Sequence, residues 1–206
     1  MKKVVYLLSI TFFLSNFSTL SAQESAENLP GDYKKRNAIY DYSHPLSDTD
    51  SIPDFASKEN PIKITGTVFL SDGFTPAKDV ILFISQPDDN GNYEVMTHLK
   101  KRYVHHRGWV KTNAEGQYTF YTFIPGTDRI SRDLKAINLT IKEPNQMEYA
   151  GNEFLFDNDP RLTDFCRKRL EKNGVDNILH PVKEGGLLVA IKNIVLDTHR
   201  VEYAKN

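Results

Sequence analysis

The stretch from Asp88 to Gly126 constrains the fold of this chain most strongly, because two turn sequences in it are each followed by a strand-forming segment. The first turn runs from Pro87 to Gly91, and its Asn-Gly pair tolerates a positive φ. The second turn, Asn113–Gly116, leads into a segment from Gln117 to Phe123 that is rich in aromatic and β-branched residues. The pattern favours short strands, with one strand beginning near Tyr93.

Further segments of the chain have the apolar patterns of strands. Residues 61–70 and 135–141 alternate between apolar and polar side chains, which is typical of half-buried strands. The continuous apolar run at 80–84 predicts a strand covered on both faces, and 153–156 and 187–195 are additional strand candidates. Residues 161–172 place apolar side chains three and four positions apart before Gly174, which predicts one short helix. We therefore expect an all-β protein, an antiparallel β-sandwich or barrel-like fold with one late α-helix.

The first 22 residues have the pattern of a secretory signal peptide. Two lysines precede an apolar run that is too short to span a bilayer, and small residues follow it. We expect an exported protein, periplasmic or extracellular, without a membrane span. Residues 23–60 are polar and contain three prolines, which predicts an N-terminal arm or linker, while 61–199 form the domain and 200–206 a tail. The single cysteine, Cys166, excludes an internal disulfide, and we expect a buried thiol.

The charge balance argues against a nucleic-acid partner. The chain has 26 basic and 27 acidic residues, so bulk charge attracts neither nucleic acid nor an anionic membrane. The basic and aromatic segment 100–109 superficially resembles a nucleic-acid patch, but the export signal and the near-zero net charge outweigh it. A small-molecule ligand is the partner we expect, and the sequence does not indicate an oligomeric state.

Three segments, in order, resemble one known family. They are GTVFLSDGFTPAKDVILFISQPDDNGNYE (66–94), RGWVKTNAEGQYTFYTFIPG (107–126) and EFLFDNDPRLTD (153–164), followed by AIKNIVLD at 190–197. Together they are similar to the catalytic domain of intradiol ring-cleavage dioxygenases, which cleave catechol and protocatechuate. The resemblance implies a β-sandwich that is also related to transthyretin-like modules. It also implies a non-haem Fe(III) held by two Tyr and two His, a set of hard phenolate oxygens and imidazoles that suits a trivalent iron.

The resemblance carries over only in part to the metal ligands. Tyr93 stands at the position of the first tyrosine ligand, after the first turn. The second tyrosine would follow Pro125-Gly126, where the chain instead reads Thr127-Asp128, so Asp128 is the nearest substitute.

The two histidine positions follow from the register of the next strand. The family histidines face the metal while their neighbours face the core, so Ile137, Leu139 and Ile141 take the core positions. This register leaves Asn138 and Thr140 at the positions of the two histidines. Three of the four implied ligands are therefore replaced, and such a set would hold Fe(III) weakly.

Several other residues are candidates for the cleft. The resemblance places Arg107 and Trp109 close to the substrate cleft, and Lys135 at the position of a family arginine. Purely structural roles are equally natural alternatives. Arg107 can pair with a carboxylate, Trp109 can cover the end of the sandwich, and Lys135 can be an ordinary solvated lysine. His98, His105 or His106 is a candidate replacement for a lost ligand, but adjacent strand residues point to opposite faces, so in an extended segment His105 and His106 would not share a metal. Exposed histidines without a function are the preferred interpretation.

The function that we expect from the sequence is an exported binding module for a small hydroxylated or anionic ligand. In this interpretation no cofactor is expected, and the family's Fe(III)-dependent ring cleavage is lost. The first alternative is an active non-haem Fe(III) intradiol dioxygenase, an oxidoreductase that acts on catecholic compounds with Tyr93 among its ligands. The second alternative is a structural or surface-interaction domain.

Overall fold

The computed structural model describes residues 30–128, 130 and 133–196, and the elements below belong to the compact unit that begins at Asp32. The expected signal peptide (1–22) and C-terminal tail (200–206) lie outside the described residues. Within the described part of the chain, no helix is both long and apolar enough to cross a bilayer.

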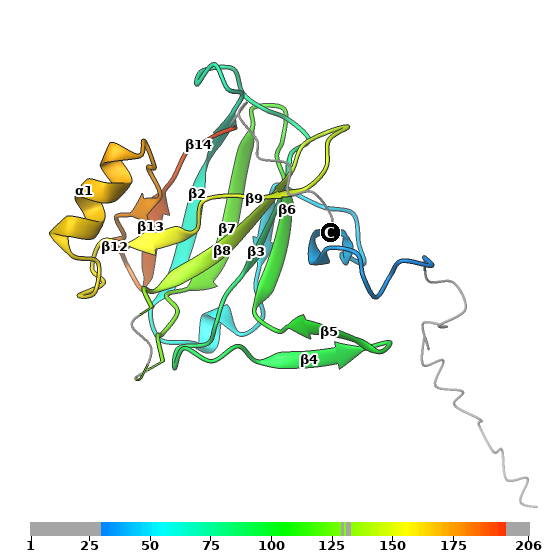
Figure 1. Ribbon diagram of the computed structural model, residues 1–206, viewed down its shortest axis with the longest axis horizontal. Helices are drawn as coiled ribbons and strands as arrows, with labels where there is room; N and C mark the ends of the chain where they lie inside the picture. The colour runs from blue at the N-terminus through cyan, green and yellow to red at the C-terminus, as the bar shows by residue number, and fades with distance from the viewer. Residues whose placement is uncertain (1–29, 129, 131–132, 197–206) are drawn as a thin grey trace, which may run out of the picture. The chain divides into compact units, whose positions relative to one another are not determined.

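Two sheets dominate this unit (Figure 1). The first has the order β1 (Thr49–Ser51), β7 (Gln117–Phe123), β2 (Pro61–Phe69), β13 (Leu187–Ile191) and β12 (Val182–Glu184), and β14 (Ile194–Val195) also pairs with β2. The second has the order β11 (Ile178–Leu179), β10 (Phe154–Phe156), β8 (Ala136–Lys142), β3 (Ile81–Ser85) and β6 (Arg107–Lys111), and β9 (Tyr149–Ala150) also pairs with β8. A separate hairpin joins β4 (Val95–His98) to β5 (Lys101–Val104), and the helix α1 spans Asp164–Lys172.

The predicted all-β sandwich with one late helix is confirmed, although its sheets are mixed rather than purely antiparallel. β1 pairs parallel with β7, β13 and β14 pair parallel with β2, and β10 pairs parallel with β11. Parallel neighbours need long connections, and the chain between β2 and β13 contains most of the domain. The short-range patterns of the sequence do not predict which distant strands pair in parallel.

The core lies between the two sheets, and strand alternation produces it. In β8 the side chains of Ile137, Leu139 and Ile141 are buried, while Asn138 and Thr140 are half-buried on the opposite face. The register that we deduced for this strand is therefore confirmed. The apolar run in β3 is buried at three successive positions, which also agrees with its predicted coverage on both faces.

Residues 32–60, which we expected to be an arm or linker, pack on the sandwich. They contain β1 and two short 3₁₀ helices, η2 (Ala38–Tyr40) and η3 (Phe55–Ser57). Ile39 of η2 is fully buried, and η2 contacts both β3 and β8. This segment therefore belongs to the compact unit, which starts at Asp32.

Replacing Ile39 with alanine should lower the free energy of unfolding by about 2–4 kcal/mol, because the change removes a buried side chain and leaves a cavity. Urea unfolding measures the difference. Ile130→Ala is the matched control, because Ile130 is 92% exposed whereas Ile39 is 0% exposed. Equal stability of the two variants would show that residues 32–60 are not part of the folding unit.

The docked segment also carries a pH-sensitive contact. The Tyr40 hydroxyl donates a 2.7 Å hydrogen bond to Glu148 Oε2, and burial, followed by that hydrogen bond and the negative charge of Glu148, raises the pKa of Tyr40 from 10.0 to about 12. A raised pKa of an acid means that its neutral form stabilises the folded state. This contribution is present below pH 10 and is lost as the pH rises toward 12. Unfolding measured between pH 9 and pH 12 should show a steeper loss of stability for the wild-type protein than for Tyr40→Phe.

Candidate functional site

The two turns that the sequence singles out contact each other through their backbones. The carbonyl oxygen of Asp88 accepts hydrogen bonds from the amides of both Gly91, at 3.1 Å, and Gly126, at 2.8 Å. A Cβ on Gly91 would lie 2.2 Å from the amide nitrogen of Asp128, and a Cβ on Gly126 would lie 2.1 Å from the carbonyl oxygen of Asp89. Gly91 also has a φ of +88°, which favours glycine. Only glycine fits at either position, and the contact brings the turn before Tyr93 against the backbone at Asp128.

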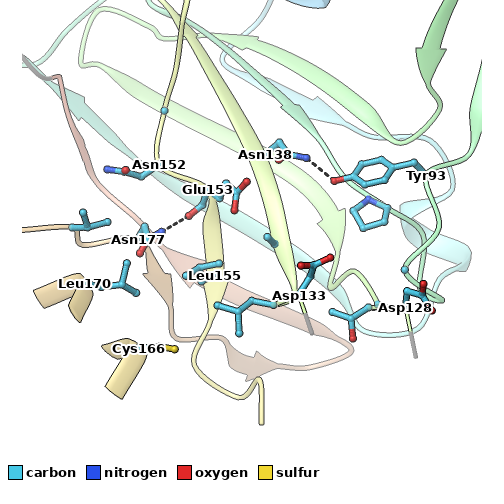
Figure 2. A pocket seen from close by; sticks show the side chains of 18 of the residues that line it. Tyr93, Asp128, Asp133, Asn138, Asn152, Glu153, Leu155, Cys166, Leu170 and Asn177 are labelled. Carbon is cyan, nitrogen blue, oxygen red and sulfur yellow. Dashed lines mark hydrogen bonds between the residues drawn. The ribbon is translucent and has the colours of Figure 1, made fainter. Parts of the chain in front are cut away.

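A pocket of about 720 Å³ opens next to these turns (Figure 2). The lining residues that matter for its chemistry are polar or acidic: Tyr93, Asp128, Asp133, Asn138, Asn152, Glu153 and Asn177. The helix α1 contributes Cys166, Arg169 and Leu170 from the opposite side. Cys166 is half-buried in this wall, so the expectation of a buried thiol was wrong.

A hydrogen bond joins Tyr93 and Asn138, which both line the pocket. Asn138 Nδ2 donates to the Tyr93 hydroxyl at 2.8 Å and to the carbonyl oxygen of Ser85 at 3.2 Å. A carbonyl accepts only from the nitrogen side of the amide, so the contact with Ser85 fixes the orientation of the Asn138 side chain. The amide nitrogen therefore faces Tyr93.

Asp159 and Arg161 of the FDNDPR segment at 156–161 form hydrogen bonds with residues at or next to the pocket lining. The buried carboxylate of Asp159 accepts from the amides of Lys135, at 2.7 Å, and Arg161, at 2.9 Å. Arg161 in turn donates from Nη1 to the Thr127 hydroxyl at 2.6 Å and to the carbonyl oxygen of Asp133 at 3.2 Å. Arg161 thus joins Thr127 to Asp133, which both line the pocket.

The far wall contains a buried amide group. Asn177 Nδ2 donates to the carbonyl oxygen of Glu153 at 2.7 Å, whereas Asn177 Oδ1 is buried without a hydrogen-bond partner among the described residues. In Figure 2, Asn152, Glu153 and Asn177 lie opposite Tyr93. The sequence reasoning missed this wall, because no pattern in 152–153 or 177 connects these residues to Tyr93.

The remaining candidates from the sequence do not line this pocket. Thr140 pairs with Phe83 of β3 and Ala150 of β9, farther along β8 than Asn138. Lys135 contributes its backbone amide to Asp159. Of the four ligand positions implied by the resemblance, the structure brings together Tyr93, Asp128 and Asn138.

Arg107 and Trp109 pack together on β6 instead. The guanidinium of Arg107 lies over the rings of Tyr103, at 3.8 Å, and Trp109, at 4.9 Å. Burial lowers the pKa of Arg107, against the opposing effect of Asp41. Trp109 Nε1 donates to the carbonyl oxygen of Ala38 at 3.1 Å, and its amide donates to Asp50 Oδ2 at 2.8 Å. Trp109 is thus part of the contact between β6 and residues 32–60, and Arg107 packs on Trp109.

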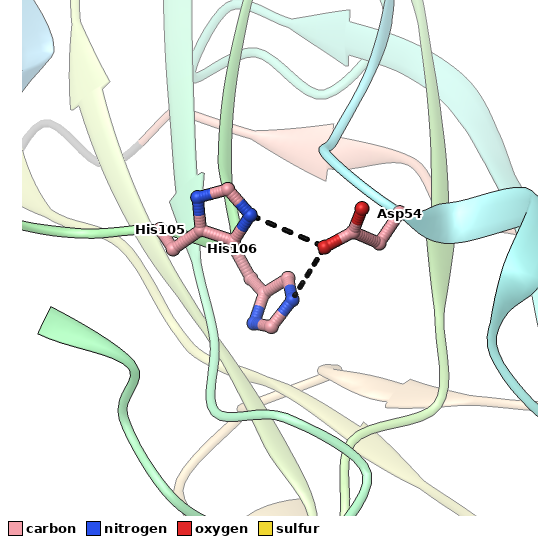
Figure 3. Close-up of side chains that lie close together, drawn as sticks. All are labelled: Asp54, His105 and His106. Atoms are coloured by element: carbon pink, nitrogen blue, oxygen red, sulfur yellow. Dashed lines mark hydrogen bonds and ion pairs between the residues drawn. The ribbon is translucent and has the colours of Figure 1, made fainter. Parts of the chain in front are cut away.

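A second cluster of polar side chains lies at the bend between β5 and β6 (Figure 3). His105 Nε2 lies 3.2 Å from Asp54 Oδ2, and His106 Nε2 lies 3.7 Å from the same oxygen. The bend allows adjacent histidines to reach one carboxylate, which an extended strand would not. The expectation of exposed histidines was wrong for His106, whose side chain is 0% exposed, while His98 lies in the exposed strand β4. Burial, together with the charges of His105 and Lys58, lowers the pKa of His106.

The residues at the pocket do not fit the Fe(III) set of the intradiol enzymes. That set needs two phenolates and two imidazoles, whereas the aligned positions offer one phenol, one carboxylate and an amide whose nitrogen faces the phenol. An amide N–H has no lone pair to give to a metal. A trivalent iron therefore finds one phenolate and no imidazole among the described lining residues.

The comparison with solved structures supports the fold. No protein-family model matches the sequence, and no curated protein matches it. Among solved structures, the dioxygenase domain of a dioxygenase carbohydrate-binding protein fusion from Streptomyces sp. SirexAA-E matches with a TM-score of 0.56 and 22% identity, over 77% of this chain and 94% of that one. An intradiol ring-cleavage dioxygenase from Tetranychus urticae matches with a TM-score of 0.54 and 18% identity, over 80% and 94% of the two chains. Hydroxyquinol 1,2-dioxygenase from Pseudomonas putida DLL-E4 matches with a TM-score of 0.53 and 15% identity, over 75% and 62%.

These similarities show that the chain has an intradiol dioxygenase-like fold. The identities are all low, so activity and substrate do not follow from the comparison.

Replacing Gly126 with alanine should lower the free energy of unfolding by about 1–3 kcal/mol, because the added methyl group must displace the backbone of the neighbouring turn. Chemical denaturation measures the loss. Gly186→Ala is the matched control, since a Cβ at Gly186 meets nothing within 4 Å. If the two variants are equally stable, the close approach of the two turns does not support the fold.

Proposed function

We propose that the pocket beside Tyr93 binds a small hydroxylated ligand, and that the chain lacks the Fe(III)-dependent catechol ring cleavage of the intradiol enzymes. The observation that carries this proposal is the hydrogen bond from Asn138 Nδ2 to the Tyr93 hydroxyl. Two side chains at ligand positions of the fold family are neighbours in space, and they bind each other with groups that do not form an iron site.

The charge of the pocket supports a hydroxylated ligand over an anionic one. Its described lining contains the carboxylates of Asp128, Asp133 and Glu153, against the single arginine Arg169. Carboxylates accept hydrogen bonds from ligand hydroxyls, whereas they repel an anion. The amides of Asn138, Asn152 and Asn177 can both donate and accept, which suits a ligand with several hydroxyl groups.

Metal analysis of the purified protein tests the loss of ring cleavage. We expect no stoichiometric iron, no visible tyrosinate-to-Fe(III) absorption band, and no oxygen consumption with catechol after incubation with iron. The opposite result, one iron per chain with an absorption band that Tyr93→Phe abolishes, would establish the active dioxygenase and overturn the proposal.

Calorimetric titration with catechol and with glucose tests the binding function. We expect saturable binding of at least one of these probes, weakened more than about tenfold by Asp133→Ala because a hydrogen bond between the ligand and a charged group is lost. Asp32→Ala, an exposed substitution outside the pocket, is the control. Failure of both probes to bind would favour a structural or surface-interaction domain.

The proposal of an exported protein rests on the sequence pattern of residues 1–22. Mass determination of the mature protein from the native host should place its N-terminus near residue 23. A mature protein that retains residues 1–22 would contradict export by this signal.

A further inference from the structure

We propose that Asp54, His105 and His106 form a binding site for a divalent transition-metal ion of the Zn²⁺ class. The cluster shares no residue with the described lining of the pocket beside Tyr93. It therefore adds a function that is independent of that pocket and of the ligand bound there.

The distances in the cluster are close to those of a metal site. One potential ligand atom from each of the three residues lies within 4.8 Å of the others, and the two distances to Asp54 Oδ2 are 3.2 and 3.7 Å. Ligands at about 2.0–2.1 Å from a tetrahedral zinc lie about 3.3 Å from one another. The two distances to the carboxylate nearly meet this geometry already. Figure 3 shows both imidazole rings directed at the same carboxylate oxygen.

The strongest independent observation is the state of the His106 ring. Its side chain is 0% exposed, and neither ring nitrogen has a hydrogen-bond partner among the described residues. Buried polar atoms are nearly always hydrogen-bonded, so an imidazole that is buried without a hydrogen bond is an exception among folded proteins. A metal ion on Nε2 would satisfy the nitrogen that already points toward Asp54.

The backbone holds the two histidines in place on the sandwich. The amide of His105 donates to the carbonyl oxygen of Glu94 at 2.8 Å, and the carbonyl oxygen of His106 accepts from the amide of Gln86 at 3.0 Å. The ring of His106 also packs edge-on against Phe123, with the ring centroids 5.0 Å apart. These contacts fix the position of the bend, so little reorganisation is needed for binding.

The side chain of Asp54 does not cap the helix that begins next to it. It occupies the N-cap of η3, where an aspartate normally accepts from a backbone amide of the helix, yet its carboxylate makes no capping hydrogen bond. The carboxylate is directed at the two histidines instead. The neighbouring cation, Lys58, is paired with Asp89 at 3.3 Å, which reduces its opposition to a bound metal ion.

The donor set determines the class of metal. Two imidazoles and one carboxylate suit zinc and its neighbours in the transition series, whereas Ca²⁺ and Mg²⁺ prefer sets of oxygen ligands. Asp54 is 51% exposed and His105 is 26% exposed, so solvent reaches the site from one side. Water or a small ligand can therefore occupy a fourth coordination position.

Titration of the tag-free, chelator-treated protein with ZnCl₂, followed by competition with a chromophoric chelator, tests the proposal. We expect one Zn²⁺ per chain, and an affinity that falls more than about tenfold in His105→Ala and in Asp54→Ala, because each variant removes a direct ligand. Substitution with Co²⁺ should give the visible absorption of a four-coordinate site in the wild-type protein only. The melting temperature should rise with Zn²⁺ in the wild-type protein and remain unchanged in both variants.

Two control variants distinguish this site from the chain's remaining metal-binding groups. His180→Ala should bind Zn²⁺ like the wild-type protein, because His180 pairs with Asp157 at 2.8 Å in a separate histidine–aspartate contact. Tyr93→Phe should also retain Zn²⁺, which would separate the site from any metal in the pocket. Binding that is absent in the wild-type protein, or equal in His105→Ala, Asp54→Ala and His180→Ala, would overturn the proposal.

Discussion

The candidate pocket depends on the hydrogen bonds that the carbonyl oxygen of Asp88 accepts. This oxygen accepts hydrogen bonds from two glycine amides that belong to different turns, and the absence of a Cβ on each glycine allows the backbones to approach. Because side-chain atoms would keep these turns apart, the position of Tyr93 relative to Asp128 is set by the backbone. The chemistry of the pocket can therefore change through substitution of lining residues while its frame stays the same.

Short-range sequence patterns predicted the parts of the fold that depend on alternation and turns. The burial of Ile137, Leu139 and Ile141 followed from their spacing, and this register correctly placed Asn138 on the pocket side of β8. The same reasoning did not exclude Thr140 from the pocket, because β9 covers the far part of the strand and only the tertiary structure shows that pairing. The extent to which residues 32–60 pack on the sandwich was not predicted for a similar reason, since a polar segment with two isolated buried isoleucines, Ile39 and Ile52, has no periodic signal.

The histidine cluster shows a second limit of sequence reasoning. Asp54 and the His105–His106 pair are about fifty positions apart in the chain, and they meet because η3 and the bend after β5 approach the same end of β7. Adjacent residues point to opposite faces only in an extended strand. His105 and His106 lie in a bend, so this rule does not apply to them. The buried state of His106 likewise depends on Phe123, a residue from a different strand.

The segment that carries β1 also determines where this protein can accept a foreign strand. β1 pairs with the outer side of β7, and the same segment accepts hydrogen bonds from β6 through the Ser47 carbonyl oxygen and the Asp50 carboxylate. An extended peptide from another chain would have to displace these contacts before it could pair with β7 on that side. Strand addition, the first step of many β-aggregates, is therefore blocked at this margin by a piece of the protein's own chain.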